Sequence, residues 1–580
     1  MPSIALNFPA TFLTLLLLPM LSLFGADERP NVILIITDDQ GYGEISAHGH
    51  PYLKTPHMDE LHAESVRLTD FHVDPTCSPT RAALLTGRHS TRTGVWHTIN
   101  GRSMMRGEEL TMAEIFQANG YATAMIGKWH LGANYPFRPS DQGFEHTVWH
   151  MDGVIGGSPD YWGNDYYDDH YMTNGEWKRY EGYCTDVWFG EAAKFVEANR
   201  EQPFFLYLST NAPHGPYIVD ERYSAPFMKR GMPENLAKFY GMIVNIDENL
   251  GNFRRQLEEM GVSENTLLIF MTDNGTTAGW ICQKSGYDYY NAGMRGWKSF
   301  AWEGGHRVPF FWHWPEGGFS EGRDVPDLTA HIDVLPTLID MLALKKPEGP
   351  EIDGQPLSKL LQGKRDSSFD DRSLFVHVQR SYLPPKWDAS VAMRGDWRLI
   401  EGRELYNLKH DPGQEKDIAE EHPEVVAELR ADYESWWESL QPAMARTVRH
   451  VLGGDENPMT LNSHDWLMPG EEVTAWHQSH VRRGDLKNGP WAVEVARDGL
   501  YEISLYRWAP YLDKAMDMKS ARLRVDAFQA SKDLSPDAEA ARFLVKLKAG
   551  PAMLQTWLER PDGDASGAYY CQVRYVGPSG

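Results

Sequence analysis

Four strongly apolar runs, each ending abruptly in polar residues, constrain the fold of this chain more than any other feature. The runs span residues 31–37, 121–126, 204–208 and 266–271. Uninterrupted apolar runs of this length are typical of strands that are covered on both faces, as in a parallel sheet. The polar residues that follow them are therefore expected at the carboxyl ends of strands, where open α/β sheets bind their ligands.

Helical patterns alternate with these runs. Thr111 and Glu114 form a capping box, and Gly120 is placed to end the helix that they start. Residues 185–199 and 234–260 also show helical periodicity. Strands that alternate with helices predict an α/β domain with a large, mostly parallel or mixed sheet flanked by helices. We assign residues 27–350 to this domain.

The pattern changes after residue 350. Short strands are expected at 374–378, 392–400 and 404–408, followed by a helix from about residue 423 to 440. These elements predict a small α+β subdomain over residues 351–445.

The remaining residues, 446–580, predict an additional β-rich domain. It opens with a polar, glycine-containing stretch near 450–470. Short alternating strands follow from residue 472, and they include 491–496, 501–506, 521–527 and 568–575. This spacing of strands predicts a β-sandwich of about 110 residues.

The first 26 residues have the pattern of a signal peptide. Their apolar run, 11–24, is short for a membrane span, and Gly25-Ala26-Asp27 is a candidate cleavage point. No Lys or Arg precedes the run, so an uncleaved N-terminal anchor is the alternative. No other run approaches a span. We therefore expect an exported protein, periplasmic or secreted, without stable membrane insertion.

Charge and cysteine content exclude several classes of protein. The chain carries 56 Lys and Arg against 81 Asp and Glu, a formal net charge of −25, which disfavours nucleic acid as a partner. An anionic substrate therefore needs a local basic site. Four cysteines are too few for a disulfide scaffold and lack the paired spacing of a zinc site. The sequence leaves open whether Cys184 and Cys282 form a bridge.

The sharpest motif is Cys77-Ser-Pro-Thr-Arg81, which precedes a helix-like run ending in Thr-Gly-Arg88. Cys77 is expected near a helix N-terminus, where free N–H groups and the helix dipole favour an anion. Arg81 lies one turn later on the same face. A buried structural cysteine before a helix is the alternative interpretation of this motif alone.

Two further clusters offer oxygen ligands. Asp38 and Asp39 follow one apolar run, and Asp273 and Asn274 follow another. A hard cation such as Ca²⁺ or Mg²⁺ prefers such a set, whereas Zn²⁺ usually prefers His or Cys.

Three more motifs add cations and histidines. Lys128 and His130 lie two residues apart in Gly-Lys-Trp-His, so in extended chain both reach one pocket. His214 follows Ala-Pro in a loop after a strand. Lys298 precedes Glu303-Gly-Gly-His-Arg-Val-Pro, a segment that we expect to be structural.

In these five motifs the chain resembles the type I sulfatases, the formylglycine-dependent branch of the alkaline phosphatase superfamily. The resemblance covers about residues 30–440. It implies an alkaline-phosphatase-like fold and a sulfuric ester hydrolase, arylsulfatase-like, that releases inorganic sulfate from a sulfate monoester. The expected substrate is a sulfated carbohydrate or an aryl sulfate.

The resemblance also implies roles for residues. Cys77 is converted by a formylglycine-generating maturation enzyme to 3-oxoalanine, and the gem-diol of this formylglycine is the nucleophile. One Ca²⁺ ion, rather than Mg²⁺, is bound beside it. The implied catalytic residues are Cys77, Arg81, Lys128, His130, His214 and Lys298, and the implied metal ligands are Asp38, Asp39, Cys77, Asp273 and Asn274.

Two loops, 96–100 and 152–169, are expected to contact substrate because they are rich in aromatic and polar residues. The candidate substrate contacts are Trp96, His97, Asn100, Asp165 and His306. Two alternative functions remain at this stage. One is a phosphonate or phosphate ester hydrolase of the same superfamily, and the other is a non-catalytic glycan-binding protein on a sulfatase scaffold.

Overall fold

The computed structural model describes residues 1–2, 29–377, 380–470 and 472–578. The expected signal peptide at 1–26 lies outside the described residues, apart from its first two. Within the described ranges, no helix is both long enough and apolar enough to cross a membrane.

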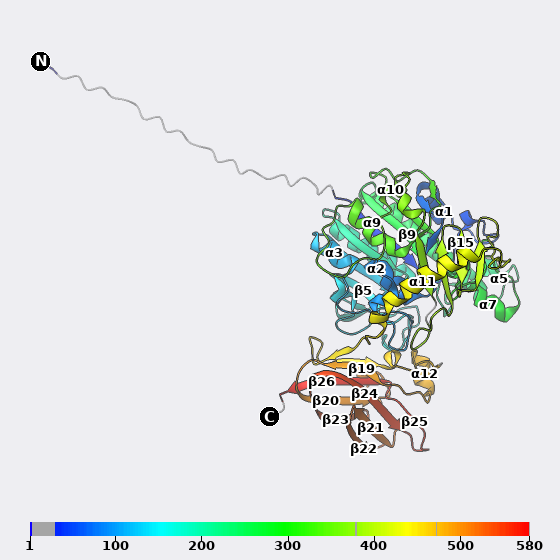
Figure 1. Cartoon of the computed structure of the whole chain (residues 1–580). Coiled ribbons are helices and arrows are strands. Elements are labelled where there is room, and N and C mark those ends of the chain that lie inside the picture. Colours follow the sequence, from blue (N-terminus) through cyan, green and yellow to red (C-terminus); the bar gives the residue numbers. More distant parts are fainter. Residues whose placement is uncertain (3–28, 378–379, 471, 579–580) are drawn as a thin grey trace.

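A ten-stranded mixed sheet forms the centre of the N-terminal part (Figure 1). In order across the sheet, the strands are β11 (Arg323–Val325), β2 (Val66–Leu68), β10 (Phe310–His313), β9 (Thr266–Thr272), β1 (Asn31–Thr37), β8 (Phe204–Ser209), β4 (Ala122–Lys128), β5 (His146–His150), β6 (His170–Thr173) and β7 (Glu176–Arg179). The five strands from β9 to β5 run parallel, and antiparallel pairings flank them. A separate parallel pair joins β3 (Phe71–His72) to β12 (Thr329–Ala330).

The side chains of β1 alternate between two apolar cores, which explains its uninterrupted apolar sequence. Ile33 and Ile35 face one core, and Val32, Leu34 and Ile36 face the other. The helices of the first core are α1 (Pro56–Glu64), α4 (Cys184–Asn199), α5 (Glu221–Met228), α6 (Glu234–Glu259) and α7 (Ala278–Ser285). Those of the second core are α2 (Cys77–Thr86), α3 (Met112–Ala118), α9 (Val334–Met341) and α10 (Ser358–Leu361).

The structure confirms the α/β class and most of the predicted elements. Thr111 and Glu114 form the capping box of α3, and Gly120 follows its C-cap with a left-handed φ of 76°. In the large sheet, β4 differs from the prediction: it continues to Lys128, so this lysine ends the strand instead of following it.

A four-stranded antiparallel sheet covered by one long helix follows the α/β part. Its strands are β13 (Ser373–His377), β14 (Ser390–Arg394), β15 (Trp397–Ile400) and β16 (Glu404–Asn407), and its helix is α11 (Pro423–Met444). The strand expected at 392–400 is therefore wrong. It is a hairpin, because Gly395 takes a left-handed φ of 49° and turns the chain between β14 and β15.

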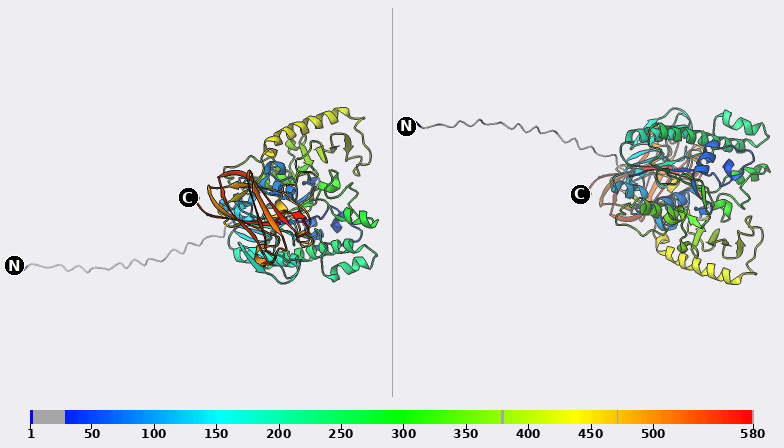
Figure 2. Two further views of the ribbon diagram at one scale, coloured as in Figure 1. Left: turned by 90° about the horizontal axis from the view of Figure 1, so that it is seen from below. Right: turned by 90° about the horizontal axis from the view of Figure 1, so that it is seen from above.

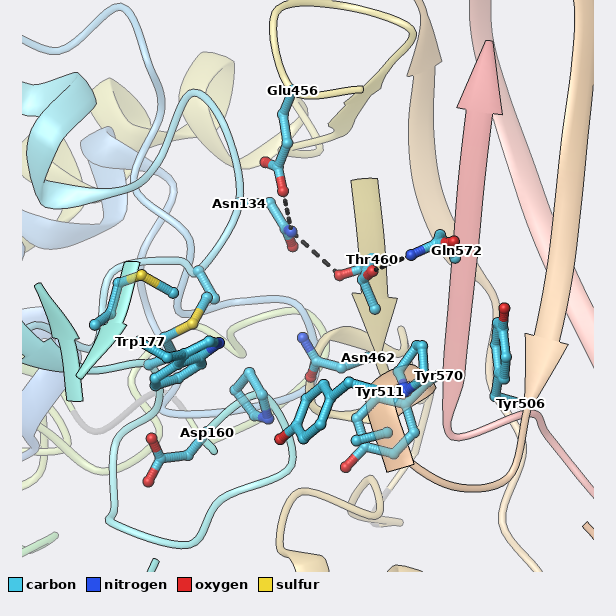
Figure 3. Close-up of a pocket in the computed structure, with 16 residues that line it drawn as sticks. Asn134, Asp160, Trp177, Glu456, Thr460, Asn462, Tyr506, Tyr511, Tyr570 and Gln572 are labelled. Atoms are coloured by element: carbon cyan, nitrogen blue, oxygen red, sulfur yellow. Dashed lines mark hydrogen bonds between the residues drawn. The ribbon is translucent and has the colours of Figure 1, made fainter. Parts of the chain in front are cut away.

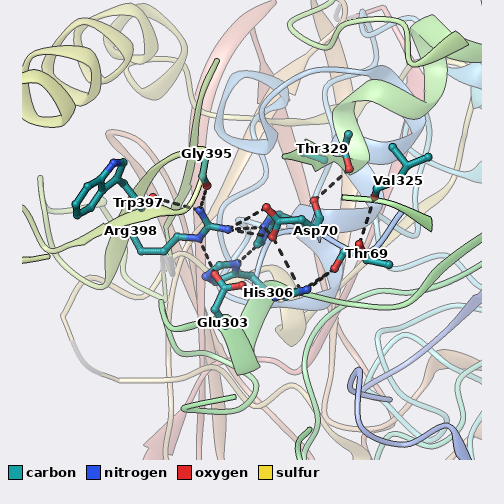
Figure 4. Close-up of polar contacts among 12 residues, drawn as sticks. Thr69, Asp70, Glu303, His306, Val325, Thr329, Gly395, Trp397 and Arg398 are labelled. Carbon is teal, nitrogen blue, oxygen red and sulfur yellow. Dashed lines mark hydrogen bonds and ion pairs between the residues drawn. The ribbon is translucent and has the colours of Figure 1, made fainter. Parts of the chain in front are cut away.

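A buried arginine fastens this small sheet to the α/β part (Figure 4). Arg398 of β15 donates to Glu303 of α8 (Glu303–His306) at 2.8 Å. It also donates to both carboxylate oxygens of Asp70, at 3.0 and 3.1 Å. Although burial alone would raise it, Arg398 and His72 hold the pKa of Glu303 at about 2. Glu303 thus serves to attach the small sheet.

The C-terminal region is a sandwich of two sheets around one apolar core. It is stacked below the α/β part in Figure 1 and lies in front of it in the left view of Figure 2, which is seen from below. One sheet contains β17 (His450–Leu452), β19 (Trp491–Val495), β24 (Gly550–Glu559), β21 (Ser520–Val525) and β22 (Phe528–Asp533), with β25 (Ala565–Ser566) beside β24. The other contains β18 (Met459–Asn462), β26 (Tyr570–Gly577), β20 (Gly499–Tyr506) and β23 (Ala541–Leu547). The stretch 450–470 thus supplies two strands instead of a polar lead-in.

Hydrogen bonds from side chains of the sandwich to backbone carbonyls hold it against the loop after β5. The side-chain amide of Gln478, in α12 (Gln478–Arg483), donates to the carbonyls of Gly157 and Tyr161 at 3.0 and 3.1 Å. The hydroxyl of Tyr570 donates to the carbonyl of Ser158 at 2.9 Å. These contacts fix one loop of the α/β part against the sandwich.

A cavity of about 440 Å³ lies at the same junction (Figure 3). Trp177 of β7 lines one side, and Tyr506 and Tyr570 of the sandwich line the other. Its polar side chains are largely engaged with the protein itself: the Asn134 amide, for example, donates to Glu456 at 3.3 Å and to the carbonyl of Thr460 at 3.1 Å. The groups that line this cavity hold the two parts together.

All four cysteines are buried and free. Cys184 lies in α4 and Cys282 in α7, so the bridge that the sequence left open is absent from the structure.

Candidate active site

The polar residues that follow the central strands converge at one edge of the large sheet, as their positions predict. Asp38 and Asp39 follow β1, and Asp273 and Asn274 follow β9. The backbone N–H of Asp39 donates to Asp273 Oδ1 at 3.1 Å, and Asn274 Nδ2 donates to Asp39 Oδ1 at 2.9 Å. Two neighbouring parallel strands thus bring three carboxylates and an amide into one cluster.

Three buried cation–carboxylate pairs form the floor of the cluster. The pairs are Lys128 with Asp38 (2.5 Å from Nζ to Oδ2), Arg81 with Asp273 (2.8 Å from Nη2 to Oδ2) and Lys298 with Asp39. Arg81 also donates to the carbonyl of Lys128 at 3.0 Å, which joins α2 to the end of β4. The formal charges of the three pairs cancel, so the site keeps three cations without a net charge of its own.

Cys77 is the first residue of α2, with Thr76 as its N-cap. Its thiol is 3.6 Å from Nζ of Lys298. Burial raises the pKa of the thiol, and Lys128 and Lys298 offset that rise only in part. Residue 77 therefore sits where a helix N-terminus and two lysines favour negative charge, yet as a cysteine it is held in the neutral form.

The oxygen atoms around Cys77 fit a hard cation. Ligand atoms of Asp38, Asp39, Cys77 and His214 all lie within 4.8 Å of one another. In the described chain, Asp38 Oδ1 and Asn274 Oδ1 are buried without a hydrogen-bond partner. Burial and the nearby carboxylate of Asp273 raise the pKa of Asp38, which is the effect expected where a positive charge is missing.

Two histidines border the cluster. His214 Nδ1 donates to the carbonyl of Gly215 at 2.6 Å, and its Nε2 lies 3.6 Å from Asp39 Oδ2. Burial lowers the pKa of His214 to about 3, despite the opposing effect of Asp39. His130 Nε2 donates to the carbonyl of Thr98 at 2.8 Å, and burial lowers its pKa as well. Both rings are neutral at pH 7 in the substrate-free protein.

Lys128 and His130 reach the same site, but not for the predicted reason. The strand ends at Lys128, and His130 has a left-handed φ of 62°, so the two side chains do not follow the alternation of extended chain. Lys128 lies beneath the cluster, against Asp38, whereas His130 lines the cavity above it.

A cavity of about 420 Å³ opens above Cys77. Three parts of the molecule contribute to its lining, which consists of Cys77, His97, Thr98, Ile99, His130, Asp152, Gly153, Val154, His214, Trp280 and Lys298 from the α/β part, Arg380 from the segment after β13, and His464, Val473 and Trp476 from the sandwich. Both predicted substrate loops, 96–100 and 152–169, contribute to this wall.

Of the five candidate substrate contacts, the structure places only His97 in the lining. Trp96 is 1% exposed and is covered by the Arg102 guanidinium. The Asn100 side chain is bonded to the backbone of Glu472 and Thr474. Trp96 and Asn100 were predicted as substrate contacts because they belong to the loop 96–100. In the structure, their side chains contact other parts of the protein and hold this loop in place.

The other two candidates lie elsewhere. Asp165 is exposed and does not line the cavity. His306 is fully buried in the network of Figure 4, where its Nε2 donates to the carbonyl of Ala301 at 3.1 Å and its Nδ1 is 2.9 Å from that of His72. Neither residue is in a position to touch a ligand above Cys77.

Sequence reasoning missed five lining residues: Trp280, Arg380, His464, Val473 and Trp476. They come from α7, the small sheet and the sandwich, and no spacing pattern links them to Cys77 in the sequence. A cation beside the end of a predicted strand was the only local signal for Arg380.

His464 forms a buried ionic link between sandwich and α/β part. Its Nε2 donates to Asp152 Oδ1 at 3.0 Å, and its Nδ1 donates to Asp465 Oδ1 at 2.9 Å. Although burial would lower it, these two carboxylates raise the pKa of His464 to about 10. The ring is thus a cation at neutral pH, and it neutralises the carboxylate that lines the cavity.

Comparisons with known proteins agree with this geometry. The family model described as "Sulfatase" matches residues 30–344, and the model "N-sulphoglucosamine sulphohydrolase, C-terminal" matches residues 293–438. The N-acetylgalactosamine-6-sulfatase of Rattus norvegicus is 29% identical over 62% of this chain and 72% of its own length. The ulvan-active sulfatase of Formosa agariphila is 31% identical over 60% of this chain and 68% of its own.

Solved structures share the fold. Ps i-CgsB, solved in complex with k-i-k-neocarrahexaose, aligns with a TM-score of 0.63 and 24% identity over 70% of this chain and 92% of that one. A phosphonate monoester hydrolase of Agrobacterium radiobacter aligns with a TM-score of 0.51 and 22% identity over 72% and 96%. At these identities the structures establish the fold alone. The family models and the curated relatives place this chain in the sulfatase family of the alkaline phosphatase superfamily, as a sulfatase enzyme.

Proposed function

We propose that this protein hydrolyses a sulfate monoester of a sulfated carbohydrate, that residue 77 acts as formylglycine, and that one Ca²⁺ ion is bound beside it. The observation that carries the proposal is the position of Cys77. It starts a buried helix, lies 3.6 Å from Lys298, and stands over three cation–carboxylate pairs at the base of an open cavity.

Asp38, Asp39, Asp273 and Asn274 would hold the cation, with residue 77 as a further ligand. Ca²⁺ is preferred over Mg²⁺ because it accepts an irregular set of carboxylate and amide oxygens without demanding octahedral geometry. When both groups are in place, the cation supplies a fixed positive charge for the sulfate oxygens and the hydrated aldehyde of residue 77 supplies the attacking hydroxyl.

The three cations of the floor have different proposed roles. Arg81 and Lys128 are committed to Asp273 and Asp38, so they orient these carboxylates and raise the positive potential beneath residue 77. Lys298 lines the cavity and contacts both Asp39 and residue 77, so its ammonium group is placed to bind a sulfate oxygen as well.

His214 and His130 are proposed to move protons. Since burial keeps His214 neutral in the free protein, the negative charge of a bound sulfate ester is what raises its pKa and lets Nε2 donate a proton to the leaving oxygen. His130 Nδ1 is buried and has no partner in the described chain, so it is available to take a proton from residue 77 as sulfate is released.

The proposal includes export to the periplasm or the exterior, and maturation of Cys77 by a formylglycine-generating enzyme. The substrate class follows relatives whose names describe sulfatases of N-acetylgalactosamine and ulvan. The fold shared with a phosphonate monoester hydrolase keeps phosphonate or phosphate ester hydrolysis as the second candidate.

The first test is the mass of the Cys77 peptide from protein co-expressed with a maturation enzyme. We expect the mass of an aldehyde at residue 77. The matured protein should then hydrolyse 4-nitrophenyl sulfate faster than 4-nitrophenyl phosphate or a phosphonate ester. The reverse order of rates would favour the second candidate, and a matured protein without any turnover would favour a glycan-binding scaffold.

A further inference from the structure

Arg380 is a cation of the active-site cavity to which the chemistry proposed above gives no task. It follows β13 of the small sheet, lines the cavity above Cys77 and is exposed. Its guanidinium lies 5.6 Å from the ring centroid of Trp280. Within the described ranges it makes neither a hydrogen bond nor an ion pair, so its five N–H donors are open to a ligand.

The other cations of the site are already matched. Arg81, Lys128 and Lys298 each face one carboxylate, and the pairs sum to zero charge. A divalent ion then adds +2 and a sulfate monoester adds −1, which leaves a net charge of +1. The negative charge that builds up on the sulfate oxygens in the transition state offsets this remaining positive charge. The charge of Arg380 is therefore surplus to the cleavage of one sulfate.

A second hydrogen-bond donor stands near Arg380. His97 Nδ1 accepts from the backbone N–H groups of Thr98 and Ile99 at 2.7 and 3.2 Å, so the proton of the neutral ring is on Nε2. Burial, and next to it the positive charge of Arg380, lower the pKa of His97 to about 3. His97 thus offers a neutral N–H in the same wall of the cavity.

The rest of the mouth suits an anionic sugar. Trp280 and Trp476 provide aromatic surface in the lining, on which a sugar ring can pack. The lining contains one carboxylate, Asp152, whose charge is balanced by His464. Among the described lining residues, there is therefore no unpaired carboxylate that would repel a second negative group on the substrate.

We propose that Arg380 and His97 form a second anion subsite, and that the preferred substrate is a sulfated sugar with a further anionic group, either a uronic carboxylate or a second sulfate. Arginine is suited to this task because its planar fork binds both carboxylate and sulfate through paired hydrogen bonds. The proposal rests on the function proposed above, whose sulfate site it leaves unchanged.

The test compares four substrates: 4-nitrophenyl sulfate, N-acetylgalactosamine 6-sulfate, N-acetylgalactosamine 4,6-disulfate, and a disaccharide of the 6-sulfated sugar with a uronic acid. The wild-type protein should have a kcat/KM at least tenfold higher on one of the last two than on the monosulfated sugar. Whether the disulfate or the uronate is the better substrate identifies the source of the second charge.

Arg380→Gln should lower kcat/KM on the preferred dianionic substrate about 10- to 100-fold more than it lowers kcat/KM on 4-nitrophenyl sulfate, mainly through KM. Arg380→Lys should recover part of the loss, and His97→Gln should reproduce a smaller share of it. Arg403→Gln, an exposed arginine of the same small sheet, is the matched control and should leave all four values unchanged.

Equal losses on all four substrates would overturn the proposal, because Arg380 would then serve the cleaved sulfate itself. A wild-type preference for the monosulfated sugar would overturn it too. If the matured protein hydrolyses none of the four substrates, the proposed function has failed. The subsite can still be tested by measuring the binding of the dianionic sugar by calorimetry. Cys77→Ala protein should then bind the dianionic sugar at least tenfold more tightly than Cys77→Ala/Arg380→Gln protein, and equal binding would refute the subsite.

Discussion

The base and the mouth of the active-site cavity are built in different ways. The base is made by one fold: residues at the ends of neighbouring parallel strands and the start of α2 meet around Cys77, and every cation there has a carboxylate partner. The mouth is made where three parts of the molecule meet, and it contains Arg380, which forms neither a hydrogen bond nor an ion pair in the described ranges. The residues proposed for the chemistry thus come from the α/β part alone, whereas the lining of the mouth depends on how the three parts are assembled.

If the base carries the chemistry, the largest loss should follow from Cys77→Ala. We expect turnover to fall about 10⁴-fold or more on every sulfate ester, whatever its alcohol, because the nucleophile is removed. Initial rates on 4-nitrophenyl sulfate and on a sugar sulfate measure the effect, with Cys282→Ala as the control. Substantial turnover by Cys77→Ala would place the chemistry elsewhere.

Removal of the proposed Ca²⁺ ion should have the next largest effect. Ligand atoms of Asp38 and Asp39 share a small buried volume with those of Cys77 and His214, so a protein dialysed against a calcium chelator should lose at least about 100-fold in kcat. Ca²⁺ should restore activity more fully than Mg²⁺. Full activity in a preparation that elemental analysis finds free of metal would contradict the assignment.

His214→Ala should separate substrates by their leaving groups. Loss of the proton donor should cost about 10²- to 10⁴-fold on a sugar sulfate, whose alkoxide leaves poorly, and less than about tenfold on 4-nitrophenyl sulfate. Paired kcat/KM values give the ratio. A similar loss on both substrates would argue that His214 orients the site and does not supply the proton.

Asp465→Asn tests the link between the mouth and the sandwich. The pKa of His464 is raised from its ordinary value near 6.5 to about 10. Its charge therefore stabilises the fold fully below pH 6.5, and this contribution is lost as the pH rises through about 10.

The variant should accordingly lose about 2–3 kcal/mol of unfolding free energy at pH 6.5, and the difference from wild type should shrink towards pH 10. Urea unfolding at the two pH values measures it. A deficit that is independent of pH would mean that Asp465 acts through packing and not through the charge of His464.

Trp476→Ala should have the smallest effect. Loss of one aromatic surface from the mouth should raise KM for a sugar sulfate about five- to tenfold, with kcat nearly unchanged, because a stacking contact is worth about 1 kcal/mol. KM for 4-nitrophenyl sulfate is the comparison. An equal rise for both compounds would show that the tryptophan shapes the cavity without selecting sugars.

The base was predictable from sequence because its residues follow recognisable strands or belong to one compact motif. Asp38 and Asp273 come directly after apolar runs, and Cys77 and Arg81 are one helical turn apart. The carboxyl ends of parallel strands all lie at the same edge of a sheet. The residues that follow them can therefore be predicted to lie close together even when the long-range packing is unknown.

The mouth was not predictable in the same way. The loops 96–100 and 152–169 were correctly expected near the site, but loop position alone does not say which side chains face the cavity. Trp96 turned out to be covered by Arg102. Arg380 and His464 reach the cavity only because the small sheet and the sandwich dock on the α/β part, and no local pattern encodes that docking.

The ionic link of His464 with Asp152 also bears on how such a protein can change over evolutionary time. Accessory domains are often treated as modules that recombine freely. Here one member of the pair is in the sandwich and the other is in the wall of the catalytic cavity, and each is buried. A recombinant in which only the sandwich was exchanged would lose His464 and leave the buried carboxylate of Asp152 without its cationic partner. The sandwich and the loop that contains Asp152 are therefore expected to be inherited together or lost together.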